Sequence, residues 1–351
     1  MTKQKIEGFK AFDTNKEGKM SCRNFVYEEN HSYVYNGEIR PCESGFHFCK
    51  SPLDVLNYYS VIDDNMNIRS AFAKVKGSGE IAEEGNKYCC SKIKIGEKLG
   101  FSDFILEAIK AILKACKTES SIGYPLQLAS NINKSQLASN GDCSRLASSG
   151  NESQLASNGN GSSLSARGDE SKLVSSGDDS QLASSGNYSQ LASSGYDSKL
   201  ASTGYYSQLA SSGDDSKLAS IGDLSRLASS GDFSRLTSSG DHSKLASSGD
   251  RSRLVSSGDF SQLESSGDNS KLASSGDDSK LASSGDNCII AGIGYKNIVK
   301  GKIGSWIVLA EYDNGLPRRI KSVKTALIDG EKIKADTFYK LENGRFVETE
   351  A

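Results

Sequence analysis

Histidine and net charge are both scarce in this chain. It has three histidines among 351 residues and a formal net charge of −2. Three histidines give no Ser-His-Asp arrangement by any spacing rule, and neither a phosphate-binding loop nor a dinucleotide fingerprint occurs. A balanced charge gives no general attraction to nucleic acid, so direct nucleic-acid binding is not expected. These absences predict a protein that is not an enzyme and that takes no cofactor.

Long apolar stretches are also missing. No run of about twenty apolar residues is present, so no membrane-spanning helix is expected. The first residues, Met1-Thr2-Lys3-Gln4-Lys5-Ile6-Glu7, lack the apolar region of a secretion signal. Eight cysteines without such a signal are typical of free thiols in a reducing compartment. We therefore expect a cytoplasmic protein with no membrane association.

A strict short repeat occupies the middle of the chain. Leucine recurs every nine residues from Leu128 to Leu281, eighteen times, in the unit Ser-x-Leu-Ala-Ser-Ser-Gly-Asp-x. A fixed short period without insertions indicates one small unit stacked on copies of itself, whereas a disordered Ser-Gly-Asp tract would not need an unbroken leucine register. Because Ser, Gly and Asp are weak helix formers, a short strand and a tight turn fit better than a helix.

The unit also predicts which side chains face inward. Strand alternation places Leu and Ser on the inner face, with the small Ala nearby. The buried hydroxyls must then pair with groups of the same or neighbouring coils. In the turn, we expect Gly to take a positive φ and Asp to hydrogen-bond nearby backbone.

The residue three positions before each leucine alternates in character from one repeat to the next. One series is mostly aromatic or apolar: Tyr188, Tyr206, Leu224, His242 and Phe260. The intervening series is mostly polar: Asp179, Asp197, Asp215, Phe233, Arg251 and Asn269. This alternation predicts a coil of 18 residues with two strands, so that odd repeats build one sheet and even repeats the other. The predicted fold is mainly β, a two-sheet β-roll or β-solenoid.

The aromatic series is the candidate binding surface. Tyr188, Tyr206, His242 and Phe260 would form an outward row, and a partly apolar strip of this kind can serve as a contact surface. The alternative is that surface positions vary freely and that the sorting is accidental. The opposite series would form ladders of exposed ion pairs, each contributing little, and its regular aspartates leave open an acidic mimic of nucleic acid.

The repeats divide the chain into four predicted regions. These are an α+β N-terminal domain over 1–100, an amphipathic capping helix over 101–120, the nonapeptide-repeat solenoid over 121–302 and a small β cap over 303–351. In the first region, strands are expected at 24–27, 32–35 and 70–75, and a short helix at 51–59 that begins with Ser51 and Pro52.

The regions beside the repeats have their own signals. Ile105, Ile109, Ile112, Leu113 and Cys116 form one apolar stripe, and a helix placed just before a solenoid is well positioned to cover its open first coil. After Leu281 the repeat decays instead of stopping, because Ile290 and Val299 keep its register. Strands are expected at 306–310 and 323–328, followed by a hairpin around Asn343-Gly344.

Two kinds of metal site are tested by spacing. Cys22, Cys42, His47 and Cys49 carry the groups that bind zinc, but their spacing is not that of a standard structural zinc site. Calcium-binding nonapeptide rolls use Gly-Gly-x-Gly-x-Asp turns, whereas each turn here has one Gly and its Asp lies four residues before the leucine. No metal site is predicted.

Both ends of the chain carry segments of one family. The N-terminal segments are Gly8-Phe9-Lys10-Ala11-Phe12, Cys22-Arg23-Asn24-Phe25-Val26-Tyr27-Glu28, Gly45-Phe46-His47-Phe48-Cys49 and Pro52-Leu53-Asp54-Val55. The C-terminal segments are Gly304-Ser305-Trp306-Ile307-Val308-Leu309-Ala310-Glu311 and Asp329-Gly330-Glu331-Lys332-Ile333-Lys334-Ala335-Asp336-Thr337. They resemble a family of uncharacterised proteins of phages and prophages of Gram-positive bacteria, which implies a phage or prophage origin.

Two further resemblances concern parts of the chain. The repeats resemble the head β-rolls of trimeric bacterial adhesins, in which Ala, Gly and Ser recur. Residues 45–49 with 53–58 resemble the strand-then-helix element of ADP-ribosyltransferase-like folds. That resemblance implies a cleft near His47 with a glutamate facing it.

These observations lead to one main functional hypothesis and two alternatives. We expect a non-enzymatic, phage-derived binding protein whose solenoid presents a repetitive face to a protein of the bacterial host; a specific version is an inhibitor of host antiviral defence. Self-association through the same face is a sub-case. The alternatives are an ADP-ribosyltransferase-like N-terminal domain, active or inactive, and an acidic nucleic-acid mimic.

Overall fold

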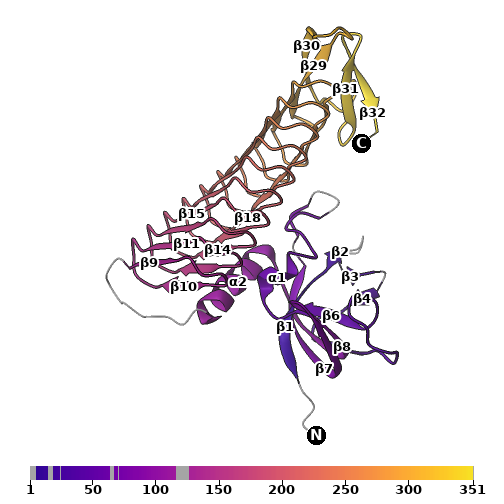
Figure 1. The fold of residues 1–351 in the computed structure, drawn as a ribbon. Helices are drawn as coiled ribbons and strands as arrows, with labels where there is room; N and C mark the ends of the chain where they lie inside the picture. Colours follow the sequence, from indigo (N-terminus) through magenta and orange to yellow (C-terminus); the bar gives the residue numbers. More distant parts are fainter. Residues whose placement is uncertain are drawn as a thin grey trace.

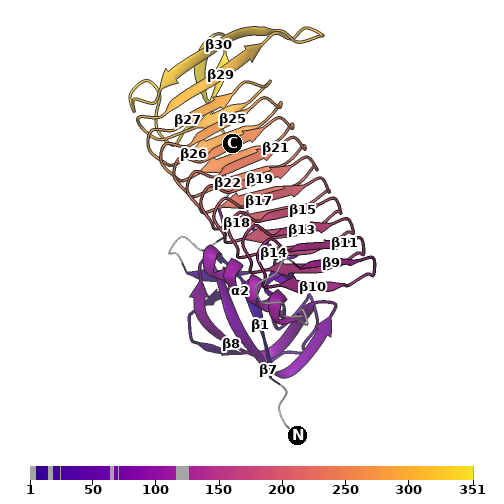
Figure 2. The same ribbon diagram turned by 90° about the vertical axis from the view of Figure 1, so that its left-hand side faces the viewer.

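The computed structural model describes residues 5–14, 19–23, 25–63, 67–69, 71–115 and 126–350. An α+β domain lies at the N-terminal end, a long β-solenoid follows it, and a small β cap closes the C-terminal end (Figure 1). The predicted fold class is therefore confirmed. Figure 2 shows the coils of the solenoid stacked one above another between the two terminal parts.

The N-terminal domain is built on an antiparallel sheet of five strands in the order β5-β8-β6-β1-β7. Its strands are β1 (Ile6–Ala11), β5 (Ser32–Val34), β6 (Phe46–Cys49), β7 (Phe72–Glu84) and β8 (Lys87–Leu99). Because β7 also pairs with β8, four of these strands form a closed ring. A smaller sheet contains β2 (Asp13–Thr14), β3 (Met20–Cys22) and β4 (Phe25–Tyr27), and the helices are α1 (Pro52–Val55) and α2 (Phe101–Ala115).

The predicted elements of this domain are present with different lengths. Strands appear near the three expected places, as β4, β5 and the start of β7, although β7 continues to Glu84. Helix α1 is only four residues long, with Pro52 at its start and no side-chain cap from Ser51. The chain turns after Val55, whose carbonyl accepts the N–H groups of Tyr58 and Tyr59.

The solenoid contains two parallel sheets, one from each half of the coil. The odd sheet contains β9 (Gln127–Ser130), β11 (Arg145–Ser148), β13 (Ser163–Ala166), β15 (Gln181–Ser184), β17 (Lys199–Ser202), β19 (Lys217–Ser220), β21 (Arg235–Ser238), β23 (Arg253–Ser256), β25 (Lys271–Ser274) and β27 (Ile289–Gly292). The even sheet contains β10 (Gln136–Ser139), β12 (Gln154–Ser157), β14 (Lys172–Ser175), β16 (Gln190–Ser193), β18 (Gln208–Ser211), β20 (Arg226–Ser229), β22 (Lys244–Ser247), β24 (Gln262–Ser265), β26 (Lys280–Ser283) and β28 (Ile298–Lys300). Leu218 pairs with Leu236 and Leu209 with Leu227, each 18 residues apart, which confirms the predicted coil.

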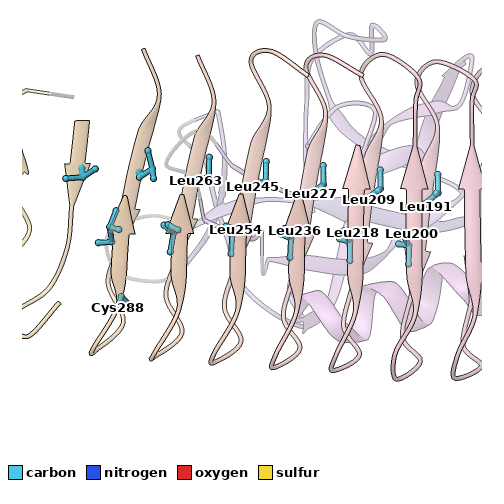
Figure 3. Close-up of a cluster of buried hydrophobic side chains, with 14 of the residues drawn as sticks. Leu191, Leu200, Leu209, Leu218, Leu227, Leu236, Leu245, Leu254, Leu263 and Cys288 are labelled. Carbon is cyan, nitrogen blue, oxygen red and sulfur yellow. The ribbon is translucent and has the colours of Figure 1, made fainter. Parts of the chain in front are cut away.

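The core between the two sheets consists of stacked leucines. The leucines from Leu146 to Leu281 are at most 1% exposed, and they form one column on each sheet (Figure 3). Full burial of each such side chain contributes roughly 1.5–3 kcal/mol. Most of the flanking serines are buried too and pair with nearby groups: Ser211 Oγ lies 2.7 Å from Ser216 Oγ, and Ser216 donates to the Gly213 carbonyl. The predicted partners are thus present for most of the buried hydroxyls, whereas the hydroxyls of Ser265, Ser270 and Ser274 have none among the described residues.

The turns differ from the prediction in the place of the positive φ. The repeat glycines have no positive φ; the residue two positions after each glycine has it instead, with values near 55° at Tyr188, Tyr206 and His242. The glycines are needed for another reason, because coils stack closely at this point. A Cβ on Gly231 would lie 2.1 Å from the Gly213 oxygen of the preceding coil. The expectation that the repeat glycine supplies the left-handed turn residue is therefore wrong.

The alanine of the repeat points outward, not inward as expected, because it lies between Leu and Ser in an alternating strand. On the odd sheet Ala201 and Ala219 are exposed. On the even sheet Ala192 and Ala210 are each 2% exposed, because they pack in one cluster with α1 and α2. The N-terminal domain therefore packs against the outer face of the even sheet.

Helix α2 lies across the even sheet, and its contacts run from β12 to β18 (Figure 1). Ile105, Ile109 and Ile112 are buried as the apolar stripe predicts. The stripe packs against the column of outward alanines. The prediction of a cap placed the helix on the open first coil instead. The Leu113 side chain, Cys116 and the rest of 116–120 lie outside the described residues.

The C-terminal cap continues both sheets. Its strands are β29 (Trp306–Tyr312), β30 (Ile320–Leu327), β31 (Phe338–Glu342) and β32 (Arg345–Thr349). Strand β29 pairs in parallel with β27 and then antiparallel with β30, whereas β31 pairs antiparallel with β28. Ile290 and Val299 keep the leucine register, and Asn343 and Gly344 form the hairpin turn between β31 and β32, as expected.

Candidate functional site

The predicted binding row lies along one edge of the solenoid. The even edge consists of the turns that lead into the even sheet, and the odd edge of those that lead into the odd sheet. Tyr188, Tyr206, His242 and Phe260 occupy the same turn position in four coils of the even edge. The rings of Tyr188 and Tyr206 stack with their centroids 5.2 Å apart, and those of His242 and Phe260 are 4.9 Å apart. These spacings match the strand separation in a sheet.

All four side chains reach solvent. Tyr188 is 56% exposed, Tyr206 36% and Phe260 50%, and His242 is exposed as well. We call these four residues the even-edge row. Leu224 occupies the same position in the coil between Tyr206 and His242, so five successive coils present an aromatic or apolar group there.

The even edge uses unusual residues for its backbone geometry. The row position has a left-handed φ, which costs most L-residues roughly 1–2 kcal/mol and is tolerated best by Gly, Asn and Asp. On the odd edge, six of nine such positions are Gly, Asp or Asn: Gly161, Asp179, Asp197, Asp215, Asn269 and Asn287. On the even edge only Asp278 is, out of ten positions. The even edge therefore carries bulky side chains where the fold alone favours small polar ones.

Part of the row lines a cleft between the solenoid and the N-terminal domain. This junction cleft has a volume of about 810 Å³, and Tyr188 and Tyr206 line it together with Tyr58 and Tyr59. His242 and Phe260 do not line the cleft; they lie two and three coils beyond Tyr206 along the same edge. The structure thus places the four predicted residues on one edge, with two of them lining a cleft.

Glutamines of the even sheet hold the N-terminal domain at this cleft. Gln190 donates to the Asn57 side chain at 2.9 Å, and Gln208 donates to the Leu56 carbonyl at 3.0 Å. Lys172 forms an ion pair with Asp54. The Gln190 Oε1 atom is buried without a partner in the described residues. Sequence reasoning did not single out these glutamines, since nothing local in a repeat shows which coils meet another domain.

The regular aspartates have a structural task. The Asp232 N–H donates to Asp214 Oδ1 at 2.9 Å, and the Asp250 N–H donates to Asp232 Oδ1 at 2.8 Å. The same ladder runs along the even edge, for example from Asp241 to Asp223. The predicted bond from Asp to nearby backbone is therefore confirmed, and the spacing of the carboxylates follows from the stacking of the coils.

A second cavity lies inside the N-terminal domain. This domain pocket has a volume of about 310 Å³, and Lys10, Cys22, His47, Tyr58 and Tyr59 are among its lining residues. The Cys22 thiol lies 2.8 Å from the Tyr59 hydroxyl, and Lys10 Nζ lies 3.0 Å from the His47 carbonyl oxygen. Sequence reasoning missed Lys10 and Tyr59, because their strand and turn are far apart in the chain.

The zinc candidates do not converge. Within the described ranges, no three His, Cys, Asp or Glu side chains lie close enough together to hold a metal ion. Burial raises the pKa of the Cys49 thiol to about 12, so this thiol stays protonated at neutral pH. Cys22, Cys42, His47 and Cys49 are not a metal centre in this structure.

The domain pocket lies beside His47, where the transferase resemblance implies a cleft. Glu43 is the acid that lines it, but its carboxylate lies 3.7 Å from the Arg40 guanidinium and is largely exposed. A pairing of His47 with a facing glutamate stays a prediction, which turnover of NAD by the full chain would test.

None of the helices in the described parts of the chain is long and apolar enough to cross a membrane.

Comparison with known proteins assigns no activity. The model of a domain of unknown function, DUF7666, matches residues 6–107, which include the N-terminal sheet, α1 and the first seven residues of α2. No curated protein and no solved structure matches the chain.

Proposed function

We propose that the protein is a non-enzymatic, phage-derived binding protein that holds a protein of its bacterial host on the even-edge row. Its solenoid is the rigid support, and the row is the part that contacts the partner. Inhibition of a host antiviral defence is the specific role that this proposal favours. The phage origin rests on the family segments at the two ends of the chain.

The observation that carries the proposal is the choice of residues at the left-handed turn position. Tyr188, Tyr206 and Phe260 keep bulky rings where Asn, Asp or Gly would give a more stable turn. In natural proteins, residues that break a local rule without a structural gain are expected at functional or strained sites. The odd edge follows the rule at six of nine positions, so the solenoid itself does not require the bulky groups.

The geometry of the row suits an extended segment of a partner. From Tyr188 to Phe260 the row crosses four coil steps, or about 19 Å at the usual strand spacing. Tyr and Phe are enriched at the centres of protein interfaces, where they bury large areas at a low entropic cost. A partner that reaches Tyr188 and Tyr206 also meets the N-terminal domain across the junction cleft.

The test compares the two edges of the same rod. Tyr188, Tyr206, His242 and Phe260 are all replaced by Asn, which accepts a left-handed φ and leaves the turn intact. The control carries Phe233→Asn and Arg251→Asn, which remove the aromatic ring and its cation from the odd edge. Each full-length protein is immobilised and exposed to lysate of a Gram-positive host, and bound proteins are quantified.

The proposal predicts at least one host protein that wild type and control retain and that the row variant loses. Equal capture by the row variant would refute it, as would a lysate in which nothing binds above bare resin. Light scattering of the purified chains reports self-association. If wild type is an oligomer and the row variant a monomer, the occupant of the row is a second copy of the chain and the host-protein version is wrong.

A further inference from the structure

The domain pocket has the character of a small-molecule site. Its volume of about 310 Å³ lies at the lower end of the range for ligand sites, roughly 300–1,000 Å³. Three of its lining rings are also exposed: Phe25 is 42% exposed, Tyr35 37% and Tyr58 45%. Exposed aromatic rings that gather around one cavity indicate a ligand that covers them.

The pocket is also positively charged. Among the described residues that line it, Lys10, Arg23 and Lys87 are basic, and Glu43 is the one acid. Lys10 is 4% exposed, and in the part of the chain that the structure describes no carboxylate forms an ion pair with it. Its Nζ instead lies 5.5 Å and 5.6 Å from the ring centroids of Phe12 and Tyr27. Burial lowers the pKa of the Lys10 ammonium group, and an anion placed beside it would offset the cost of burial and favour the charged form.

His47 also lies within the positive charge of the pocket, and it adds a hydrogen-bond acceptor. Burial, together with the charges of Lys87, Lys10 and Arg23, lowers the pKa of this imidazole to about 4. The ring is therefore neutral at pH 7, and its Nε2 atom is buried with no hydrogen-bond partner in the described part of the chain. A neutral imidazole nitrogen in this position is suited to accept an N–H from a ligand.

We propose that the domain pocket binds a small aromatic anion of the nucleoside monophosphate class. The phosphate would lie toward Lys10, Arg23 and Lys87, and the base against the exposed rings. An N–H group of the base would meet His47 Nε2. This site lies in the N-terminal domain, is separate from the even-edge row, and requires no turnover of the ligand.

The test is calorimetric titration of the full chain. AMP, GMP, CMP and UMP are the probes, and adenosine and inorganic phosphate represent the two halves of the ligand. At least one monophosphate should bind saturably, and adenosine and phosphate should each bind at least about tenfold more weakly. Lys10→Met should weaken monophosphate binding at least about tenfold and leave adenosine binding unchanged. The matched control Lys92→Met removes an exposed lysine of β8 outside the pocket and should change neither.

A second readout guards against misfolding of the Lys10 variant. If circular dichroism shows that Lys10→Met is unfolded, Lys87→Met takes its place, because Lys87 is only partly buried. In the wild-type chain, a bound monophosphate should slow alkylation of Cys22 in the pocket and leave the exposed Cys143 of the solenoid unaffected. The proposal is wrong if none of the four monophosphates saturates, or if the folded lysine variant binds them as wild type does. The four-Asn row variant should bind them normally, which separates this test from that of the proposed function.

Discussion

Replacing one repeat glycine by alanine should destabilise the protein far more than the addition of a single methyl group suggests. Gly249 lies in a turn of the odd edge, and a Cβ built there would lie 2.1 Å from the Gly231 oxygen, 2.4 Å from its carbonyl carbon and 2.8 Å from the Asp232 nitrogen. All three atoms belong to the backbone of the preceding coil. No side-chain rotation relieves the overlap, so the two coils must separate locally by about 1 Å.

The cost follows from what fixes the spacing of the coils. Asp250 N–H donates to Asp232 Oδ1 at 2.8 Å across the same gap, and parallel strands on both sides hold the coils at about 4.8 Å. Overpacking typically costs 1–3 kcal/mol, and a weakened hydrogen bond adds about 1 kcal/mol. We expect Gly249→Ala to lose about 3 kcal/mol of unfolding free energy.

The assay is urea unfolding followed by circular dichroism, with hydrogen exchange to locate the damage. Coils that contain Gly231 and Gly249 should lose protection first, since each coil is stabilised mainly by its neighbours. The control is Ser248→Ala, because Ser248 is exposed in the same turn and its hydrogen bond within the described residues is a backbone one, from its N–H to the Ser229 carbonyl. Wild-type stability in Gly249→Ala would refute the account of why glycine recurs.

Three further predictions test the packing and the electrostatics. Ala210→Glu should lower the free energy of unfolding by at least about 2 kcal/mol and make α2 accessible to limited proteolysis, because Ala210 is buried beneath that helix. The control Ala219→Glu, on the exposed odd sheet, should be tolerated. The four-Asn row variant should unfold at a urea concentration equal to or above that of wild type. The relief of left-handed backbone strain, about 1–2 kcal/mol per position, outweighs the loss of two ring stacks of about 0.5–1.5 kcal/mol each. A clearly lower midpoint would mean that the rings stabilise the fold. His47 has a folded pKa of about 4 against an ordinary value of 6.5, so the unfolded chain binds its proton first, and the stability from the neutral ring should be lost as pH falls from 6.5 toward 4. His47→Gln should flatten the pH dependence of the unfolding midpoint over that interval, and an unchanged slope would contradict the pKa assignment.

The coil could be predicted because its signals are repeated and local. The leucine register, carried on by Ile290 and Val299, gives the strands, and the alternation between Tyr188 and Asp197 gives two sheets. A hydrogen-bonded parallel ladder repeats every side chain at one spacing, so the pattern of the sequence passes directly into the structure. In contrast, the strain of the bulky residues at the left-handed turn position of the even edge could not be recognised from the sequence. The sequence pattern assigned the positive φ to the repeat glycine instead.

The docking of the N-terminal domain could not be predicted from the repeat. Ala210 and Ala219 have the same neighbours in sequence, yet one is buried under α2 and the other is exposed. The difference depends on which sheet meets the helix, and that is a long-range contact. The one hint is compositional: the outward positions of the even strands from Ala138 to Ala246 are all Ala or Val, whereas the odd strands include Ser165 and Thr237. The domain pocket is hidden for the same reason, because its lining groups come from β1, β3, β6 and the turn after α1, which are far apart in the chain.

This docking decides how a partner can approach the solenoid. The even sheet is covered from β12 to β18, so in this region only the odd sheet and the two edges are open. The odd sheet presents mainly Ala, Lys, Arg and Gln, and the odd edge mainly Asp and Asn, so neither offers an aromatic anchor of comparable length. The even-edge row begins at the junction cleft, which Tyr188 and Tyr206 line together with Tyr58 and Tyr59. A partner held there would touch both the rod and the N-terminal domain, and it would therefore also stabilise the contact between them. If the row is the binding surface, Gln208→Ala, which removes a fastening contact without touching the row, should weaken partner capture, whereas Gln262→Ala, three coils further along the even sheet, should not.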